Sequence, residues 1–182
     1  MKNSITILFI GGLMVLNASC WKPDLKHAHP NAQKLMTDDF LWSPLEQSSP
    51  FGNDDGADAI WEFKEWRKSN KRKSPLIFIK NLLNEWNYTV YDYSQIDTLE
   101  IRLFINSSDI GDRLCFGIDD VIIATGFGQF ILEGKIDTDL KQLTLIALNR
   151  QLNPMLLKYV DKDYREIRIK QLNKLIEIIN AA

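Results

Sequence analysis

The chain has 182 residues, of which 45% are hydrophobic and 25% charged, as is usual for a globular protein. Its net charge of −2 gives no overall attraction to nucleic acid, so we expect no nucleic-acid partner. The two cysteines, Cys20 and Cys115, are too few for a disulfide-stabilised scaffold.

The first segment resembles a bacterial export signal. Lys2 precedes an apolar run over residues 5–16, and the small residues Ala18 and Ser19 lead to Cys20. This order is typical of a lipoprotein signal, which is cut before a cysteine that is then acylated. Asn17 stands where that pattern favours Leu. An ordinary signal peptide cut near residue 18 and an uncleaved anchor therefore remain alternatives.

We accordingly predict a signal peptide over residues 1–19, a tether over 20–37 and one globular domain over 38–182. We expect acyl chains on Cys20 to hold the domain at a membrane of the cell envelope. We predict no other apolar run long enough to span a bilayer. Trp21 after the cysteine resembles outer-membrane sorting in a Gram-negative bacterium.

The two cysteines allow two interpretations. With Cys20 acylated, Cys115 is left as a free, buried thiol. Without acylation, an oxidising compartment would permit a Cys20–Cys115 disulfide.

The next elements are predicted in chain order. Residues 38–50 are broken by prolines and serines and indicate an irregular strap. Residues 57–68 are good helix formers without Gly or Pro. Ser74 and Pro75 are suited to the N-cap and first turn of a helix that carries an apolar stripe from Leu76 to Trp86.

The middle of the chain predicts the only strands. Residues 88–93 are aromatic and β-branched, and Leu99, Ile101, Leu103 and Ile105 alternate with other residues. Two such runs joined by a polar segment indicate a β-hairpin.

Helices are expected again towards the C-terminus. They cover residues 119–133 with an end at Gly134, a segment that starts near Asp137 and stops at Pro154, and residues 163–180. The sequence thus predicts a predominantly α (α+β) fold, a compact helical domain with a small β-hairpin.

An acidic loop is the strongest candidate site. Asp54, Asp55, Asp58 and Glu62 could supply oxygen ligands to Ca²⁺ or Mg²⁺, and such a site could support hydrolysis. An EF-hand is excluded because Phe51 stands at the first ligand position. The simpler interpretation, which we favour, is that Asp54 and Asp55 cap the following helix.

Other polar groups give weaker indications. Asp24, His27 and His29 could contribute to a metal site but are too few for a usual zinc site, and we expect them to be solvated. The basic run over residues 64–73 could touch anionic lipid head groups, although a solvated helix end is the simpler interpretation.

Signatures of catalysis are not evident. No Gly-x-Ser-x-Gly motif occurs, and both histidines precede the predicted domain. Residues 126–128 read Gly-Phe-Gly, but Ile131 stands where a dinucleotide loop needs its third glycine. We predict no catalytic residue and no cofactor.

Several motifs resemble those of a family of uncharacterised bacterial proteins typified by YfeS. They are Trp42-Ser43-Pro44, the Pro-Phe-Gly-Asn-Asp-Asp-Gly-Ala-Asp run over residues 50–58, Trp66-Arg67, the helix around 122–124, and Arg150 to Pro154. The resemblance covers about residues 38–180 and implies a shared fold but no activity. The export signal would be a departure from that family.

The predicted function is that of a membrane-tethered, non-enzymatic envelope lipoprotein that binds another macromolecule. We expect an accessory or immunity-like role. A metal-dependent hydrolase, or a Ca²⁺- or Mg²⁺-binding protein, built on the acidic loop is the alternative.

Overall fold

The computed structural model describes residues 22–88 and 91–182, and within these ranges every regular element is a helix. In chain order they are η1 (Leu25–His27), α1 (Pro30–Leu35), η2 (Asp39–Trp42), α2 (Asp54–Ser69), α3 (Pro75–Glu85), α4 (Thr98–Ile105), α5 (Gly111–Glu133), α6 (Thr138–Gln151), η3 (Leu156–Tyr159) and α7 (Arg165–Ala181), where η denotes a 3-10 helix. The predicted predominance of helix is confirmed.

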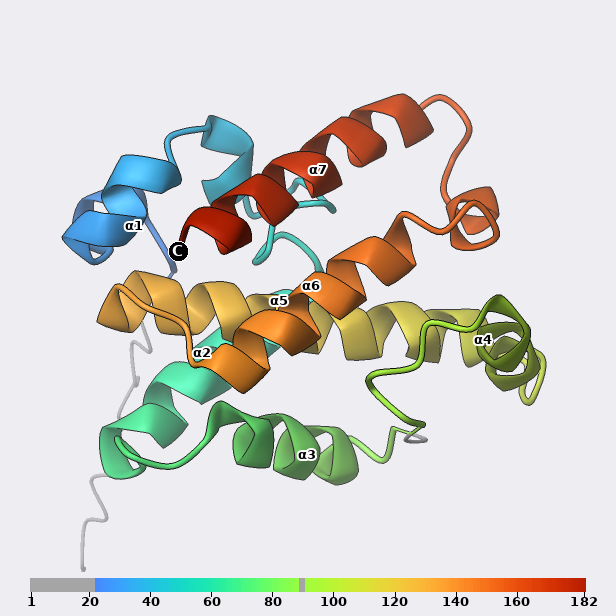
Figure 1. Cartoon of the computed structure of the whole chain (residues 1–182), viewed down its shortest axis with the longest axis horizontal. Helices are drawn as coiled ribbons and strands as arrows, with labels where there is room; N and C mark the ends of the chain where they lie inside the picture. The colour runs from blue at the N-terminus through green and yellow to red at the C-terminus, as the bar shows by residue number, and fades with distance from the viewer. Residues whose placement is uncertain (1–21, 89–90) are drawn as a thin grey trace, which may run out of the picture.

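The α5 helix is the centre of the molecule. It contacts α1, α2, α3, α4 and α6, while α7 packs against α6 (Figure 1). Every residue from 121 to 131 is buried. By length and composition α5 could cross a membrane, so the prediction of no second run of that length is wrong. Since 89% of its apolar window is buried inside the protein, α5 has the character of a core helix.

Local capping explains where several helices begin and end. The Asn53 side chain accepts a hydrogen bond from the Gly56 amide at 2.7 Å and caps α2, so the cap is Asn53 rather than the predicted Asp54 and Asp55. Ser74 caps α3 as predicted. Gly134, with φ of 71°, ends α5 in the left-handed conformation that glycine adopts without strain.

The predicted β-hairpin is absent from the described residues. Asp97 caps α4, and Ile101 and Ile105, four residues apart, share its buried face. The alternating pattern therefore also fits one side of a helix. The backbone carbonyls of Tyr93 and Gln95 pair with the Arg150 side chain instead of a neighbouring strand. Residues 89–90 lie outside the described part.

The folded body begins earlier than predicted. Residues 25–36, expected to be tether, form η1 and α1, and the side chains of Ala32 and Met36 are fully buried. The His29 amide donates to the Ile131 carbonyl at 2.8 Å and the Asn31 side chain to that of Gly134 at 2.9 Å. This segment therefore covers the C-terminal end of α5. The predicted signal peptide and Cys20 lie outside the described residues.

A buried ion pair joins α5 to α6. The side chains of Asp119 and Arg150 are both fully buried and hydrogen-bonded to each other. The same guanidinium donates to the carbonyls of Tyr93 and Gln95 at 2.9 and 2.8 Å. One cation thereby fixes two helices and the segment before α4. Cys115, also fully buried, is a free thiol whose pKa burial raises to about 11.

We expect Asp119→Asn to lower the free energy of unfolding by about 3–5 kcal/mol, because Arg150 would remain buried without a counter-charge. Urea denaturation would measure the change. Lys174→Gln is the control, because its ion pair with Glu177 is exposed and should contribute less than about 1 kcal/mol. Equal stability of the two variants would contradict the structural role of the buried pair.

Candidate functional site

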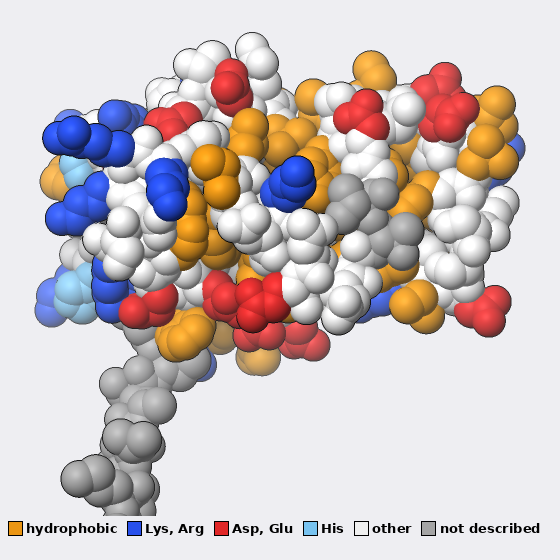
Figure 2. All heavy atoms as spheres, turned by 90° about the horizontal axis from the view of Figure 1, so that it is seen from below, with side chains coloured by type: hydrophobic (Ala, Val, Ile, Leu, Met, Phe, Trp, Pro, Cys, Tyr) orange, Lys and Arg blue, Asp and Glu red, His pale blue; other side chains and the backbone are white. Residues whose placement is uncertain are grey.

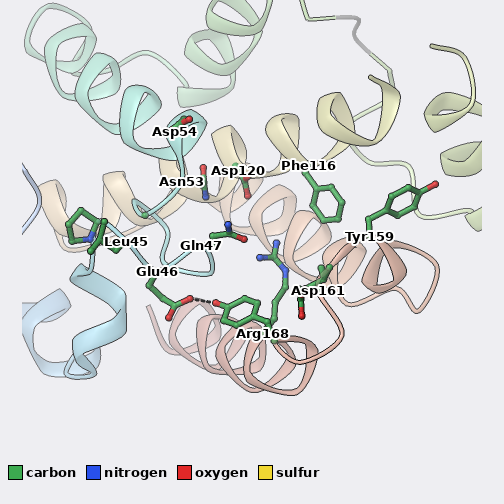
Figure 3. Close-up of a pocket in the computed structure, with 14 residues that line it drawn as sticks. Leu45, Glu46, Gln47, Asn53, Asp54, Phe116, Asp120, Tyr159, Asp161 and Arg168 are labelled. Atoms are coloured by element: carbon green, nitrogen blue, oxygen red, sulfur yellow. Dashed lines mark hydrogen bonds between the residues drawn. The ribbon is translucent and has the colours of Figure 1, made fainter. Parts of the chain in front are cut away.

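A pocket of about 770 Å³ lies between the segment before α2, the first half of α5 and the start of α7. Residues 44–47 and 52–54 form one wall, Phe116 and Asp120 come from α5, and residues 159–161 close the opposite side (Figure 3). Volumes of 300–1,000 Å³ are usual for small-molecule sites. The pocket is therefore large enough for a ligand.

Asp120 and Arg168 form the floor of this pocket, and Gln151 connects them. The Gln151 side chain donates to the Asp120 carboxylate at 2.9 Å and accepts a bond from Arg168 Nη2 at 2.8 Å. Gln151 is buried because it lies in the last turn of α6, between α5 and α7. An acid and a base are thereby held close to each other with a neutral amide between them.

Arg168 is the most unusual residue of the site. Only 5% of its surface is exposed, and its buried Nε has no hydrogen-bond partner. Its guanidinium carbon lies 5.7 Å from the centre of the Phe116 ring. Figure 3 shows the side chain rising from α7 towards Asp120 and Gln47. Burial lowers the pKa of Arg168, and the nearby acids Asp120 and Asp119 oppose that shift.

The Asp120 carboxyl is affected by the same environment. Loss of hydration raises its pKa to about 7, although the bond from Gln151 and the charge of Arg168 favour the ionised form. Asp120 can therefore change its charge near neutral pH.

Tyr164 fastens the rim of the pocket. Its hydroxyl lies within hydrogen-bond distance of the Glu46 carboxylate, of Ser48 Oγ at 3.0 Å and of Gln171 Oε1 at 3.0 Å. The predicted strap over residues 38–50 thus begins with η2, and its second half is bound to α7. This link fixes Glu46, an acidic residue of the lining, to the start of α7.

The charge of the pocket is predominantly negative. Four carboxylates line it, and Arg168 is the cation among its lining residues. The acids are Glu46, Asp54, Asp120 and Asp161.

The four residues of the predicted metal site do not come together. Asp54 lines the pocket, whereas Asp55 is buried and accepts bonds from Tyr88 at 2.6 Å and from Arg113. Glu62 lies elsewhere along α2, where burial, Glu85 and Asp58 raise its pKa. Within residues 22–88 and 91–182, no three acidic, histidine or cysteine side chains are grouped to hold a metal ion.

The two histidines have local structural roles. His27 Nδ1 lies 2.8 Å from an Asp24 oxygen, and that carboxylate caps η1. His29 caps α1 by accepting the Asn31 amide at 3.2 Å. The His29 ring also packs against Gly134, a position where any Cβ would collide with it.

Basic side chains gather at one end of the molecule. The Arg67 side chain bonds to Glu133 and to the Lys73 carbonyl, which joins the ends of α2 and α5, and η1 and α1 cover the same end. Figure 2 shows the cations at this end, where the described chain begins. The exposed members are Lys26, Lys34, Lys68, Lys71, Arg72 and Lys73, and we call this set the basic end.

Comparison with known proteins gives one extended similarity. The chain is 30% identical over 160 residues to the uncharacterised protein YfeS of Escherichia coli, a match that covers 83% of this chain and 62% of YfeS. The similarity supports a YfeS-like family. The chain spans about three fifths of the length of YfeS, whose activity is itself uncharacterised.

A shorter similarity concerns an enzyme. Hypoxanthine-guanine phosphoribosyltransferases of chimpanzee and human are each 35% identical to this chain over 63 residues, which is 35% of this chain and 29% of each enzyme. No family model and no solved structure matches the chain.

Sequence reasoning did not identify the floor of the pocket. Arg168 lies at helical spacing from Leu172, Leu175 and Ile179, so a cation falls on the apolar stripe of α7. A cation at a position expected to be buried was the feature of the sequence that could have indicated the site. Its connection to Asp120 through Gln151 depends on three different helices and has no counterpart in local spacing.

We expect the wild-type protein to lose stability as the pH rises from 5 to 8. Asp120 has a higher pKa in the folded state, about 7, than in the unfolded state, where it is near 4. The resulting stabilisation is fully present at pH values below 4 and is lost as the pH rises through 7. Asp120→Asn should reduce that loss by on the order of 1 kcal/mol, since solvent in the pocket screens the charge.

Thermal melts at pH 5.5 and 8 would measure the effect, about 2–4 °C in Tm for a chain of this size. Burial raises the pKa of Asp119 as well, to about 6, so the variant should flatten the pH dependence without abolishing it. Asp161→Asn, which alters an exposed carboxylate of the same pocket, is the control. Identical pH dependence in Asp120→Asn and wild type would exclude Asp120 as the titrating group.

Proposed function

We propose that this chain is a lipid-anchored, non-enzymatic binding protein of the bacterial cell envelope, with the pocket around Arg168 as its binding site. The observation that carries the proposal is the buried guanidinium of Arg168, whose set of hydrogen bonds is incomplete. Arg168 lines a pocket of about 770 Å³. A buried charge without full pairing lowers stability. Binding of a ligand would account for its presence.

The envelope location rests on the sequence before the fold. The apolar run over residues 5–16 followed by Cys20 supports export and acylation. Only four residues separate Cys20 from η1, so a chain of about 3.5 Å per residue would keep the domain within about 20 Å of its lipids. In a Gram-negative host, Trp21 supports the outer membrane as the destination.

The basic end supports the same orientation. Its lysines and arginine lie at the end of the molecule where the described residues begin, and anionic head groups attract such cations by about 1 kcal/mol per charge near the surface. In this orientation the basic end contacts the membrane, and the pocket, formed by other elements, stays open to a small ligand or to a protein partner, as an accessory or immunity-like role requires.

Hydrolysis by a bound metal is less well supported. Asp55 is engaged with Tyr88 and Arg113, and only Asp54 of the predicted ligands lines the pocket. The short match to phosphoribosyltransferases covers too little of either protein to favour their activity.

We expect Cys20→Ala to release the protein from membranes, because the variant would have no acyl chains to bury in the bilayer. Fractionation of the native host and intact-mass measurement of the purified protein would test this. Cys115→Ala is the matched control, since that buried thiol should have no part in anchoring. A Cys20→Ala protein that stays in the membrane fraction, or a wild type without acyl mass, would contradict the anchor.

We expect the substitutions Lys71→Gln, Arg72→Gln and Lys73→Gln to weaken binding to anionic vesicles. They are introduced into the Cys20→Ala protein, and binding is compared with that of Cys20→Ala alone. Three charges at about 1 kcal/mol each predict a loss of roughly a hundredfold at low salt. Co-sedimentation with phosphatidylglycerol vesicles would measure it, with phosphatidylcholine vesicles for comparison. The exposed residues Lys158, Lys162 and Lys170, changed to Gln, form the control. Equal losses in both triple variants would contradict contact through the basic end.

A further inference from the structure

Arg168 presents more hydrogen-bond donors than the protein satisfies. A guanidinium carries five N–H groups, and the bond of 2.8 Å to Gln151 is the one hydrogen bond that the described structure gives to the Arg168 side chain. Nε is buried without a partner, and no carboxylate of the described residues forms an ion pair with this arginine. A planar guanidinium in this state is suited to a carboxylate, which can accept two of its N–H groups in parallel.

Gln151 prevents the protein from supplying that carboxylate itself. Its amide nitrogen bonds to the Asp120 oxygen and its amide oxygen to Arg168. Asp120 and Arg168 are therefore connected through a neutral group and do not neutralise each other directly. The floor of the pocket consequently presents separate donor and acceptor positions.

The walls of the pocket favour a positive charge. Glu46, Asp54 and Asp161 add to Asp120, so the lining carries a net negative charge even with Arg168 included. Such a lining repels simple anions such as phosphate and attracts amines. A ligand that satisfies both requirements carries a carboxylate for Arg168 and more than one positive charge for the surrounding acids.

Aromatic rings complete the site. Phe116 already lies beside the Arg168 guanidinium, and the ring of Tyr159, half of whose surface is exposed, lines the opening. These surfaces can cover the methylene groups of a long side chain or the face of a second cation.

We propose that the pocket binds a basic amino acid, free or as part of a short peptide, with its carboxylate on Arg168 and its amino and side-chain cations on Asp120 and the acidic walls. This inference rests on the proposed function, because it names the ligand class of the same pocket. It does not depend on the lipid anchor.

Isothermal titration of the full-length protein in detergent would test the inference with four matched probes. L-arginine is the expected ligand. Agmatine lacks its carboxylate, L-citrulline lacks its side-chain charge, and inorganic phosphate tests for a general anion site. We expect agmatine and citrulline to bind at least about tenfold more weakly than arginine, and phosphate to bind more weakly still, because each loses a charged hydrogen bond or meets repulsion.

Two variants locate the binding. Arg168→Met should abolish the preference for arginine over agmatine, and Asp161→Asn should weaken arginine at least about threefold more than it weakens citrulline. Asp163→Asn is the control for the second variant, because Asp163 is exposed in the same loop and does not line the pocket. Asp161→Asn keeps the oxygen that accepts the Asp163 amide, so it should fold even if Arg168→Met does not.

The possible failures are distinguishable. Preferential binding of phosphate, or equal binding of arginine and agmatine, would overturn this inference and leave a binding pocket in place. If no probe binds and Arg168→Met is at least as stable as wild type, only the ligand class is overturned. If no probe binds and Arg168→Met is strongly destabilised, Arg168 is a structural residue, and the inference and the proposed binding site fall together.

Discussion

The architecture depends on the burial of the Asp119 carboxylate in the central helix. The Asp119 carboxylate in α5 is shielded from solvent and therefore requires a counter-charge, which Arg150 of α6 supplies. The same guanidinium holds two carbonyls of the segment before α4. Because Gln151 follows Arg150 directly, the register that brings Arg150 to Asp119 also brings Gln151 between Asp120 and Arg168. The floor of the pocket is thus a consequence of the buried pair.

The sequence motifs on which the resemblance to the YfeS-like family was predicted mostly have structural roles in this protein. Arg67 bonds to Glu133 and Asp55 to Arg113, and both pairs join α2 to α5. Arg150 bonds to Asp119 and joins α6 to α5. In the last motif, Gln151 does not line the pocket but bonds to two residues that do, Asp120 and Arg168. The acidic loop contributes residues 52–54 to the lining. The similarity to YfeS therefore says more about residues that stabilise the fold than about the identity of a ligand.

The predictions from the sequence succeeded where the determinant was local. Ser74 before Pro75 and Gly134 after a long apolar run mark helix ends by their own backbone preferences, and both mark real ends. The prediction of a hairpin was wrong because Ile101 and Ile105 fit one face of a helix as well as one face of a strand. Only the element packed against them decides between helix and strand. The prediction of a tether was wrong for α1, because this helix is stabilised by contacts with the end of α5 and its own sequence has no sustained apolar period.

The sequence by itself determined the helical class and the ends of several helices, since these depend on neighbouring residues and on the length of apolar runs. It also motivates the proposed lipid anchor. The tertiary structure alone decided that the acidic loop is divided between a helix contact and a pocket wall, and that Arg168 faces Asp120 across Gln151. Those side chains come from separate helices, and the distance between them is set by how the helices pack. No local rule of spacing contains that information.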